Sequence, residues 1–221
     1  MGAVYLVRHG QASFGARDYD ELSELGARQS AAVGEELRRR TGRITRVRCG
    51  TLRRQRDTAA AAGFDAIEDP RWNEYDHEAV LAAHAELGAG GNPGAAGGRV
   101  QEMLDGALLR WIAADGAGEA SNGQALEHWS GFAARVTEAL DELVAELNRG
   151  EDALVVTSGG VIGALVAREL GCQADGFVPL HRVTCNVGIT KFVTGRSGTS
   201  LVSFNEHGHL EHDAAALLTY R

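Results

Sequence analysis

The chain has few cysteines and no long hydrophobic run. Its three cysteines, Cys49, Cys172 and Cys185, lie far apart and form no CxxC pair. This spacing argues against a disulfide framework and a structural zinc site, and it favours reduced thiols in the cytoplasm. No stretch approaches the roughly 20 apolar residues of a membrane span, and no basic region precedes the first apolar residues. We therefore expect a cytoplasmic protein with neither a membrane anchor nor a secretory signal.

An excess of positive charge is also lacking. The formal net charge is −8 at pH 7, which argues against broad nucleic-acid binding. An anionic ligand would need a local arginine cluster, and the sequence has one around Arg8 and another in RRQR at 53–56. The 221 residues fit a single domain.

Apolar, β-branched stretches alternate with amphipathic ones along the chain. The first kind predicts strands at 4–7, 44–49, 153–157 and a pair near 183–194 and 199–205. The second kind predicts helices at about 24–40 with Ser23 as N-cap, 52–62, 76–87, 99–114, 125–148 and 160–170. A polar stretch at 13–20 and a glycine-rich one at 88–98 predict loops. This order predicts an α/β fold, a three-layer sandwich with a mostly parallel central sheet flanked by helices.

Polar turns follow several of the predicted strands. Arg8, His9 and Gly10 follow the first, residues 51–54 the second, and residues 158–160 a later one. Ligands of open α/β sheets bind at the carboxyl ends of the strands. We therefore expect these turns to converge on one ligand site.

The side chains of these turns suit phosphate chemistry. A neutral imidazole such as that of His9 can attack phosphorus when its other ring nitrogen is held by a hydrogen bond. Arg8 beside it, and Arg54 at the start of a helix, can donate to phosphate oxygens. Taken alone, these residues favour an ordinary strand end and a solvated arginine face.

A carboxylic acid could serve the same site. Glu74 and Asp76, in the stretch WNEYDHE, are candidates to protonate a leaving alcohol oxygen. Paired carboxylates in a loop are more often surface residues, so the local sequence alone does not support a catalytic role.

The motifs together resemble the histidine phosphatase superfamily, the phosphoglycerate-mutase-like proteins. The matching stretches, in the family's order, are LVRHGQASF (6–14), LSELGARQSA (22–31), TLRRQRDTAA (51–60), WNEYD (72–76) and VVTSGGVIGAL (155–165). The resemblance covers most of the chain and implies a single domain over 1–221. It is thinnest at about 70–125, which we expect to be a helical and loop insertion that forms a lid over the active site.

The resemblance implies a mechanism. His9 would attack the phosphoryl group, Arg8 and Arg54 would hold its oxygens, and Glu74 would protonate the leaving group. Of the neighbouring candidates, the family pattern thus selects Arg54 and Glu74. It implies no metal and no cofactor, and the partner is a small phosphorylated molecule.

Ser158 departs from the family pattern. It stands where the family usually has its second histidine, and the RHGQASFG opening with the TSGG turn is similar to a branch that has this serine. Ser158 could bind phosphate together with the backbone N–H groups of Gly159 and Gly160, or it could cap the next helix, and these uses are compatible. A serine hydrolase is disfavoured because Val156 stands where a nucleophile elbow needs glycine.

Further departures follow His9. Ala12 and Gly15 stand where the family commonly has threonine and asparagine, and Gln11, Ser13 and Gly15 are the candidate substrate contacts that remain. His77 and His128 are candidates to restore the missing positive charge, or else structural histidines. His207, His209 and His212 are expected in a solvated tail without a metal site, His209 matching a structural position of the family.

We expect a phosphomonoester phosphatase with a phosphohistidine intermediate and modest activity. The alternative is a catalytically impaired protein that binds a phosphate ligand. A phosphoglycerate mutase is a third possibility, disfavoured because Ser158, Ala12 and Gly15 would loosen the cage around the intermediate. The substrate and the oligomeric state stay open, a homodimer being one option.

Overall fold

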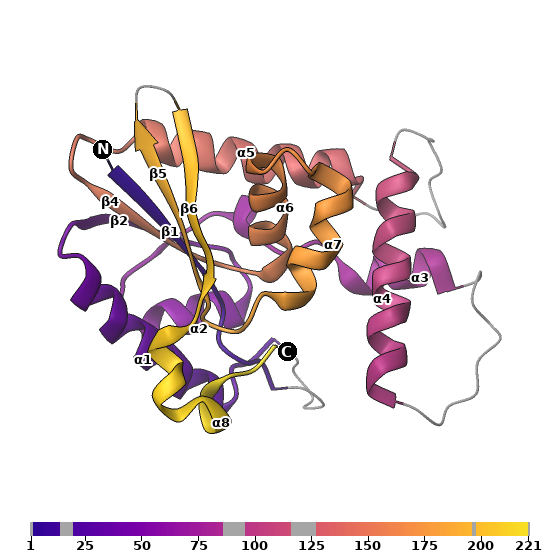
Figure 1. The fold of residues 1–221 in the computed structure, drawn as a ribbon, viewed down its shortest axis with the longest axis horizontal. Coiled ribbons are helices and arrows are strands. Elements are labelled where there is room, and N and C mark those ends of the chain that lie inside the picture. Colours follow the sequence, from indigo (N-terminus) through magenta and orange to yellow (C-terminus); the bar gives the residue numbers. More distant parts are fainter. Residues whose placement is uncertain (1, 14–19, 86–95, 116–126, 196–197, 221) are drawn as a thin grey trace.

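A twisted sheet lies at the centre of the molecule, between two layers of helices (Figure 1). The computed structural model describes residues 2–13, 20–85, 96–115, 127–195 and 198–220. In these residues the sheet has six strands, in the order β3-β2-β4-β1-β5-β6. The strands are β1 Gly2–Arg8, β2 Ile44–Cys49, β3 Ile67–Glu68, β4 Asp152–Thr157, β5 Ile189–Gly195 and β6 Gly198–Glu206.

Strand pairing confirms the predicted, mostly parallel sheet. β1 and β2 both pair in parallel with β4, and β3 pairs in parallel with β2. β5 runs antiparallel to β1 and to β6. Arg8 at the end of β1 is in register with Thr157 at the end of β4, so the turns after these two strands lie side by side.

Helices cover both faces of the sheet (Figure 1). The helices are α1 Glu24–Arg40, α2 Arg53–Ala61, α3 His77–Ala85, α4 Ala96–Ala113, α5 Trp129–Ala145, α6 Gly159–Glu169, α7 Gln173–Val183 and α8 Ala214–Leu217, with 3-10 turns η1 Pro70–Trp72 and η2 Gly208–Asp213. α1, α2 and α8 cover one face, whereas α5, α6 and α7 cover the other. α3 and α4 lie beyond α7, away from the sheet.

The alternation of side chains in β1 explains the three layers. Val4 and Leu6 point into the core beneath α5 and α6, and Tyr5 and Val7 point into the core beneath α1 and α2. All four are buried, because a strand with helices on both faces has no solvent side. The predicted α/β sandwich is confirmed.

The prediction near residue 183 was wrong. Helix α7 was missed, and the strand expected from 183 begins at Ile189. Pro179 lies inside α7, and proline together with β-branched residues lowers helix propensity. The chain turns before β5, where Val187 has a φ of 51°. Tertiary packing of α7 on α6 thus overrides the local sequence signal.

Two other expectations change. The stretch around His209 is not a solvated tail: it forms η2, whose Leu210 is buried in the core beside α1. Most of the expected loops at 13–20 and 88–98 lies outside the described residues, but 96–98 belong to α4.

Within the described ranges, no helix combines the length and the apolar character that a bilayer crossing requires.

Candidate active site

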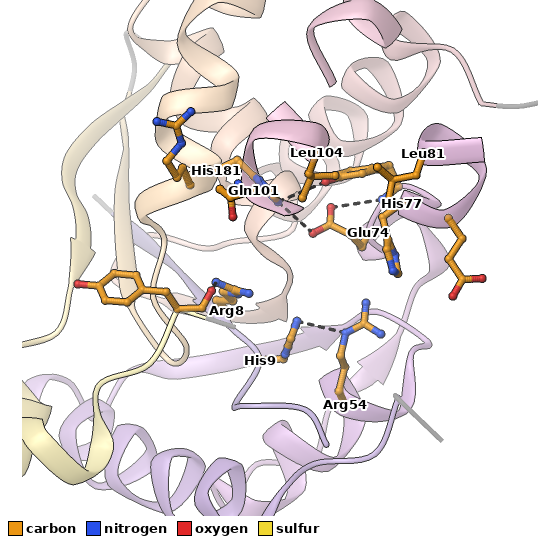
Figure 2. Close-up of a pocket in the computed structure, with 13 residues that line it drawn as sticks. Arg8, His9, Arg54, Glu74, His77, Leu81, Gln101, Leu104 and His181 are labelled. Carbon is orange, nitrogen blue, oxygen red and sulfur yellow. Dashed lines mark hydrogen bonds and ion pairs between the residues drawn. The ribbon is translucent and has the colours of Figure 1, made fainter. Parts of the chain in front are cut away.

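A cavity of about 410 Å³ opens at the carboxyl end of β1. Arg8 and His9 reach it from the end of β1, Arg54 from the first turn of α2, and Glu74 from the loop after η1 (Figure 2). His9 and Arg54 lie on one side, with Glu74 across the cavity from them. These four residues, expected from the sequence to act together, thus line one cavity.

The backbone around His9 is held from several sides. Its N–H donates to Thr157 O (2.8 Å), and Asn186 Nδ2 donates to its carbonyl oxygen (3.0 Å). The N–H of Gly10 donates to Thr58 Oγ1 (2.9 Å). A Cβ on Gly10 would lie 2.6 Å from Gly26 O, so only glycine lets α1 approach this closely. His9 is buried, with 6% of the residue exposed, and its backbone therefore has a fixed position.

Hydrogen bonds define the tautomer of His9. Nδ1 lies 2.8 Å from Gly10 O, which can only accept, so Nδ1 carries the proton. Nε2 accordingly has the lone pair and accepts from Arg54 Nε at 3.1 Å. Burial, followed by the charges of Arg54 and Arg8, lowers the pKa of His9 well below its usual value. The ring is neutral at pH 7, with its nucleophilic nitrogen toward the arginines.

Asp20 positions Arg54, a role that the sequence did not indicate. Leu52, at the N-cap of α2, has no side-chain group to cap the helix. The Asp20 carboxylate accepts instead from Arg53 N (2.6 Å) and from Arg54 Nη1 (2.6 Å). It thus caps α2 from another segment and aims Arg54 at the same time.

The three arginines of RRQR have different surroundings. Arg53 pairs with Glu21 and Arg56 with Glu68, both on the solvent side with side chains more than 40% exposed. Arg54 is the one of the three that lines the cavity. It is also the arginine of this run that the family resemblance selects.

The guanidinium of Arg8 is held by the end of the chain. Its Nη1 donates to the carbonyl oxygens of Thr184 and of Tyr220, the latter at 3.0 Å. Tyr220 also lines the cavity. The segment 217–220 is attached to the fold by Asn186, whose N–H donates to Thr219 O at 2.8 Å. Sequence reasoning had not linked this segment to the site.

The two candidate carboxylates lie in the loop at 73–76 between η1 and α3, here called the acid loop, and they have different partners. Glu74 Oε2 accepts from the N–H of Gly160 at 3.0 Å, and Oε1 accepts from Tyr75 N at 3.3 Å. A Cβ on Gly160 would overlap Glu74 Oε1. Asp76 instead accepts from Ala79 N at 2.9 Å at the start of α3. Glu74 lines the cavity, whereas Asp76 caps a helix.

Ser158 lies in the turn between β4 and α6, and its side chain is buried. It occupies the N-cap position of α6, as expected, but its side chain makes no cap hydrogen bond. Its fully buried hydroxyl accepts from Gln55 Nε2 at 2.8 Å. Gln55 Nε2 also donates to Trp72 O at 3.1 Å. The absence of a cap hydrogen bond corrects the expected side-chain cap. Ser158 is not among the residues that line the cavity, and its use as a phosphate donor stays a prediction.

Gly159 and Gly160 follow Ser158 in the turn. The Gly160 N–H, expected to point at an anion, is used by Glu74. Gly159 lies between Arg8 and His181, since a Cβ on it would come within 3.7 Å of both side chains. Because these two residues have no side chains, Arg8, His181 and Glu74 can pack closely against the turn.

Two of the expected substrate contacts near His9 make hydrogen bonds within the fold. Gln11 Oε1 accepts from Ser23 Oγ at 2.9 Å, and the Ser13 N–H donates to Glu21 O at 2.7 Å. Neither Gln11 nor Ser13 lines the cavity. Gly15 lies outside the described residues.

Of the other histidines, His77 and His181 line the cavity. His128 is exposed at the N-cap position of α5 and lies outside it. His181 was missed, because the helix that carries it was missed. Over the described part of the chain, no group of three His, Cys, Asp or Glu side chains is arranged to hold a metal ion.

Comparisons with known proteins agree with this geometry. The sequence pattern described as "Histidine phosphatase superfamily (branch 1)" matches residues 4–207. No curated protein sequence matches the chain. A mycobacterial glucosyl-3-phosphoglycerate phosphatase in complex with VO3 is similar in structure, with a TM-score of 0.62, 26% identity and coverage of 94% of this chain and 100% of that one.

A second similar structure is a phosphoserine phosphatase from Entamoeba histolytica, in a mutant form bound to phosphoserine. Its TM-score is 0.63 at 20% identity, and the alignment covers 95% of this chain and 100% of that one. At this identity it supports the fold alone, in agreement with the six-stranded sheet. The family pattern covers most of the chain, and we conclude that this protein belongs to branch 1 of the histidine phosphatase superfamily.

Proposed function

We propose that the protein is a metal-independent phosphomonoester phosphatase with a phosphohistidine intermediate on His9. The observation that carries this proposal is the neutral His9 ring, whose Nε2 lone pair lies 3.1 Å from Arg54 Nε in a cavity shared with Glu74. A buried nucleophile, two guanidinium groups and a carboxyl group are the parts that phosphoryl transfer without a metal needs.

The first half of the reaction forms the intermediate. Oxygens of an entering phosphoryl group compete for the Arg54 N–H that His9 Nε2 accepts, which releases the lone pair for attack. As the Nε2–P bond forms, the bond from phosphorus to the leaving oxygen breaks. Glu74 in its protonated form gives its proton to that oxygen, while Arg8 and Arg54 balance the charge of the phosphoryl group.

The second half reverses these roles. The Glu74 carboxylate, held by the Gly160 N–H, takes a proton from a water molecule that attacks phosphorus. The Nε2–P bond breaks, and inorganic phosphate and neutral His9 result. Because Nδ1 stays bonded to Gly10 O, the same tautomer is ready for the next cycle.

The substrate is a small phosphomonoester. A cavity of about 410 Å³ suits a small molecule, and the similar structures are a phosphoserine phosphatase and a glucosyl-3-phosphoglycerate phosphatase. We further assign the chain to a branch with serine at the position of the second histidine, on its RHGQASFG and TSGG motifs. The alternative is a phosphate-binding protein of low activity, which the retention of Glu74 beside the cavity disfavours.

The test measures phosphate release from an aryl phosphate by the wild-type protein and by His9→Ala. We expect turnover that the substitution abolishes, and a phosphorylated protein that intact-mass spectrometry detects after a rapid alkaline denaturing quench, because the P–N bond of phosphohistidine is labile in acid. His128→Ala is the matched control, since His128 is exposed and outside the cavity. Equal turnover in His9→Ala would refute the mechanism. Background rates in both, with stabilisation of the wild type by phosphate, would favour the binding protein.

A further inference from the structure

His181 lies beside the turn that carries Ser158, although no motif points to it. It comes from α7 and lines the same cavity as His9 and Glu74. A Cβ on Gly159 would lie 3.5 Å from His181 Cδ2, 3.7 Å from His181 Nε2 and 3.7 Å from Arg8 Nε. The imidazole therefore reaches the cavity next to the Arg8 guanidinium. Figure 2 shows it across the cavity from His9, on the side of Glu74.

Aromatic rings fix the orientation of His181. Its ring stacks on Phe177, with centroids 5.6 Å apart and planes 26° apart, and it meets the ring of Tyr75 at 5.8 Å. Such packing leaves the ring few orientations. The edge that carries Nε2 points toward Tyr75 Oη and Glu74.

The neighbours of the two ring nitrogens indicate how His181 is protonated. Nε2 lies 3.4 Å from Tyr75 Oη and 4.0 Å from Glu74 Oε2, and both oxygens can accept. Nδ1 is buried and has no hydrogen-bond partner within the described residues. A second proton would be a buried, unsatisfied donor on Nδ1. His181 is thus a neutral imidazole with its proton on Nε2.

Other charges around His181 are consistent with this state. Burial lowers its pKa, and Arg8 of β1 lowers it further. Glu74, and Asp105 of α4, act in the opposite direction. The neutral form is the one that donates a hydrogen bond from Nε2 without bringing a charge.

A phosphoryl group in the cavity would need a further hydrogen-bond donor on the side opposite His9. Ser158 faces Gln55, and the Gly160 N–H is occupied by Glu74. The Nε2 proton of His181 makes no short hydrogen bond in the described structure, since its nearest acceptors are 3.4 and 4.0 Å away. His77 of α3 also lines the cavity, but His181 is the histidine whose ring is fixed by aromatic packing beside Arg8.

We propose that His181 is a further catalytic residue, whose Nε2–H donates to an oxygen of the phosphoryl group during its transfer to His9. This inference rests on the proposed phosphatase function. The His9 Nε2–P bond forms as the bond to the leaving oxygen breaks, and Glu74 supplies the proton for that oxygen. His181 keeps its own proton throughout. It takes the place of the second histidine of the family from another helix, as a neutral donor.

The test compares His181→Ala with His181→Gln, whose amide can donate from nearly the same place. Loss of one transition-state donor costs about 10²–10³ in rate, so we expect His181→Ala to lower kcat by about 10²-fold with little change in KM. His181→Gln should stay within about 10-fold of the wild type. His128→Ala and His128→Gln, at an exposed histidine outside the cavity, are the matched controls.

Vanadate adds a readout that does not need turnover. It imitates the five-coordinate phosphoryl group, so its affinity should fall in His181→Ala by a factor similar to that in kcat and recover in His181→Gln. Thermal unfolding of each variant establishes that it is folded. If the wild type lacks turnover, vanadate affinity decides the role of His181 alone.

The outcomes separate this inference from the proposed function. Wild-type kcat and vanadate affinity in His181→Ala, beside an inactive His9→Ala, would overturn the role of His181 and leave the phosphatase intact. Equal losses of kcat and vanadate affinity in folded His181→Ala and His181→Gln would contradict the role of His181 as a neutral hydrogen-bond donor. Full turnover in His9→Ala would overturn the proposed function itself.

Discussion

Gln55 Nε2 donates a hydrogen bond of 2.8 Å to Ser158 Oγ. This bond ties α2 to the turn after β4 and engages the Ser158 hydroxyl within the fold. The same amide nitrogen donates to Trp72 O at 3.1 Å, near the acid loop. Gln55 of α2 therefore connects its own helix to η1 and to the turn after β4, and Ser158 is the residue that it contacts in that turn.

Ser158→Ala tests this role. The Gln55 amide would keep Trp72 O as acceptor, so we expect a loss in the free energy of unfolding of about 1 kcal/mol, typical of one hydrogen bond. We expect kcat to change by less than about 3-fold, because a lost phosphate donor would cost about 10²–10³. Steady-state kinetics and urea denaturation measure the two effects. A loss in kcat of about 10²-fold, with the stability unchanged, would place the hydroxyl on the phosphoryl group.

Gly160→Ala tests Glu74 as the general acid. The new Cβ would overlap Glu74 Oε1 and lie 2.8 Å from the Tyr75 ring, so the carboxyl group must move. General acid catalysis contributes about 10²–10⁴ in rate. We expect kcat for alkyl phosphates, whose leaving groups need a proton, to fall by about 10²-fold, and kcat for 4-nitrophenyl phosphate to fall much less.

Gly131→Ala is the matched control for this experiment. Gly131 lies in α5, and a Cβ there would meet only the Glu127 side chain, at 3.9 Å. The Gly131→Ala variant should gain about 0.5–1 kcal/mol in the free energy of unfolding from helix propensity, and its kcat for both substrates should stay that of the wild type. Equal losses in Gly160→Ala for both leaving groups would contradict the role of Glu74.

Asp20→Asn tests the carboxylate that aims Arg54. It weakens the bonds to Arg53 N and Arg54 Nη1, both 2.6 Å. We expect a loss of about 1 kcal/mol from the helix cap and a drop in kcat/KM of about 10-fold from the misplaced guanidinium. Asp57→Asn is the control, because Asp57 lies in α2 itself and pairs with the exposed Arg53 at 3.5 Å. Identical kinetics in the two variants would mean that Asp20 acts on the helix alone.

His209 gives the fold a dependence on pH. It lies in η2, and its ring nitrogens are buried without a hydrogen-bond partner among the described residues. Burial lowers its pKa from 6.5 to about 4. Between these values the unfolded chain binds a proton that the folded chain does not, so stability rises with pH and is lost as the pH falls from 6.5 toward 4.

His209→Gln should therefore reduce this loss. We compare the free energies of unfolding at pH 8 and pH 5, where the wild type should lose about 1 kcal/mol more than the variant, below the full linkage because the ring is partly exposed. His212→Gln, at an exposed histidine of the same 3-10 turn, should lose as much as the wild type. An unchanged difference in His209→Gln would show that other groups cause the acid instability.

The sequence by itself determined most of the fold and the chemistry of the nucleophile. β1, β2 and β4 carry apolar and β-branched runs, and Ser23 caps α1 by accepting from Gly26 N at 3.0 Å. These signals are local, because periodicity and capping depend on residues a few positions apart. The family motifs then identified His9, Arg54 and Glu74, and the structure brings these three to one cavity.

Only the tertiary structure decided what surrounds them. Asp20 reaches Arg54 across 34 positions of sequence, and Ser158 turns toward Gln55 across 103. His181 reaches the cavity from α7, and the proline and β-branched residues of this helix prevent its prediction from the local sequence. Contacts between distant segments depend on how helices pack on the sheet, and that packing is a property of the whole core rather than of any one motif.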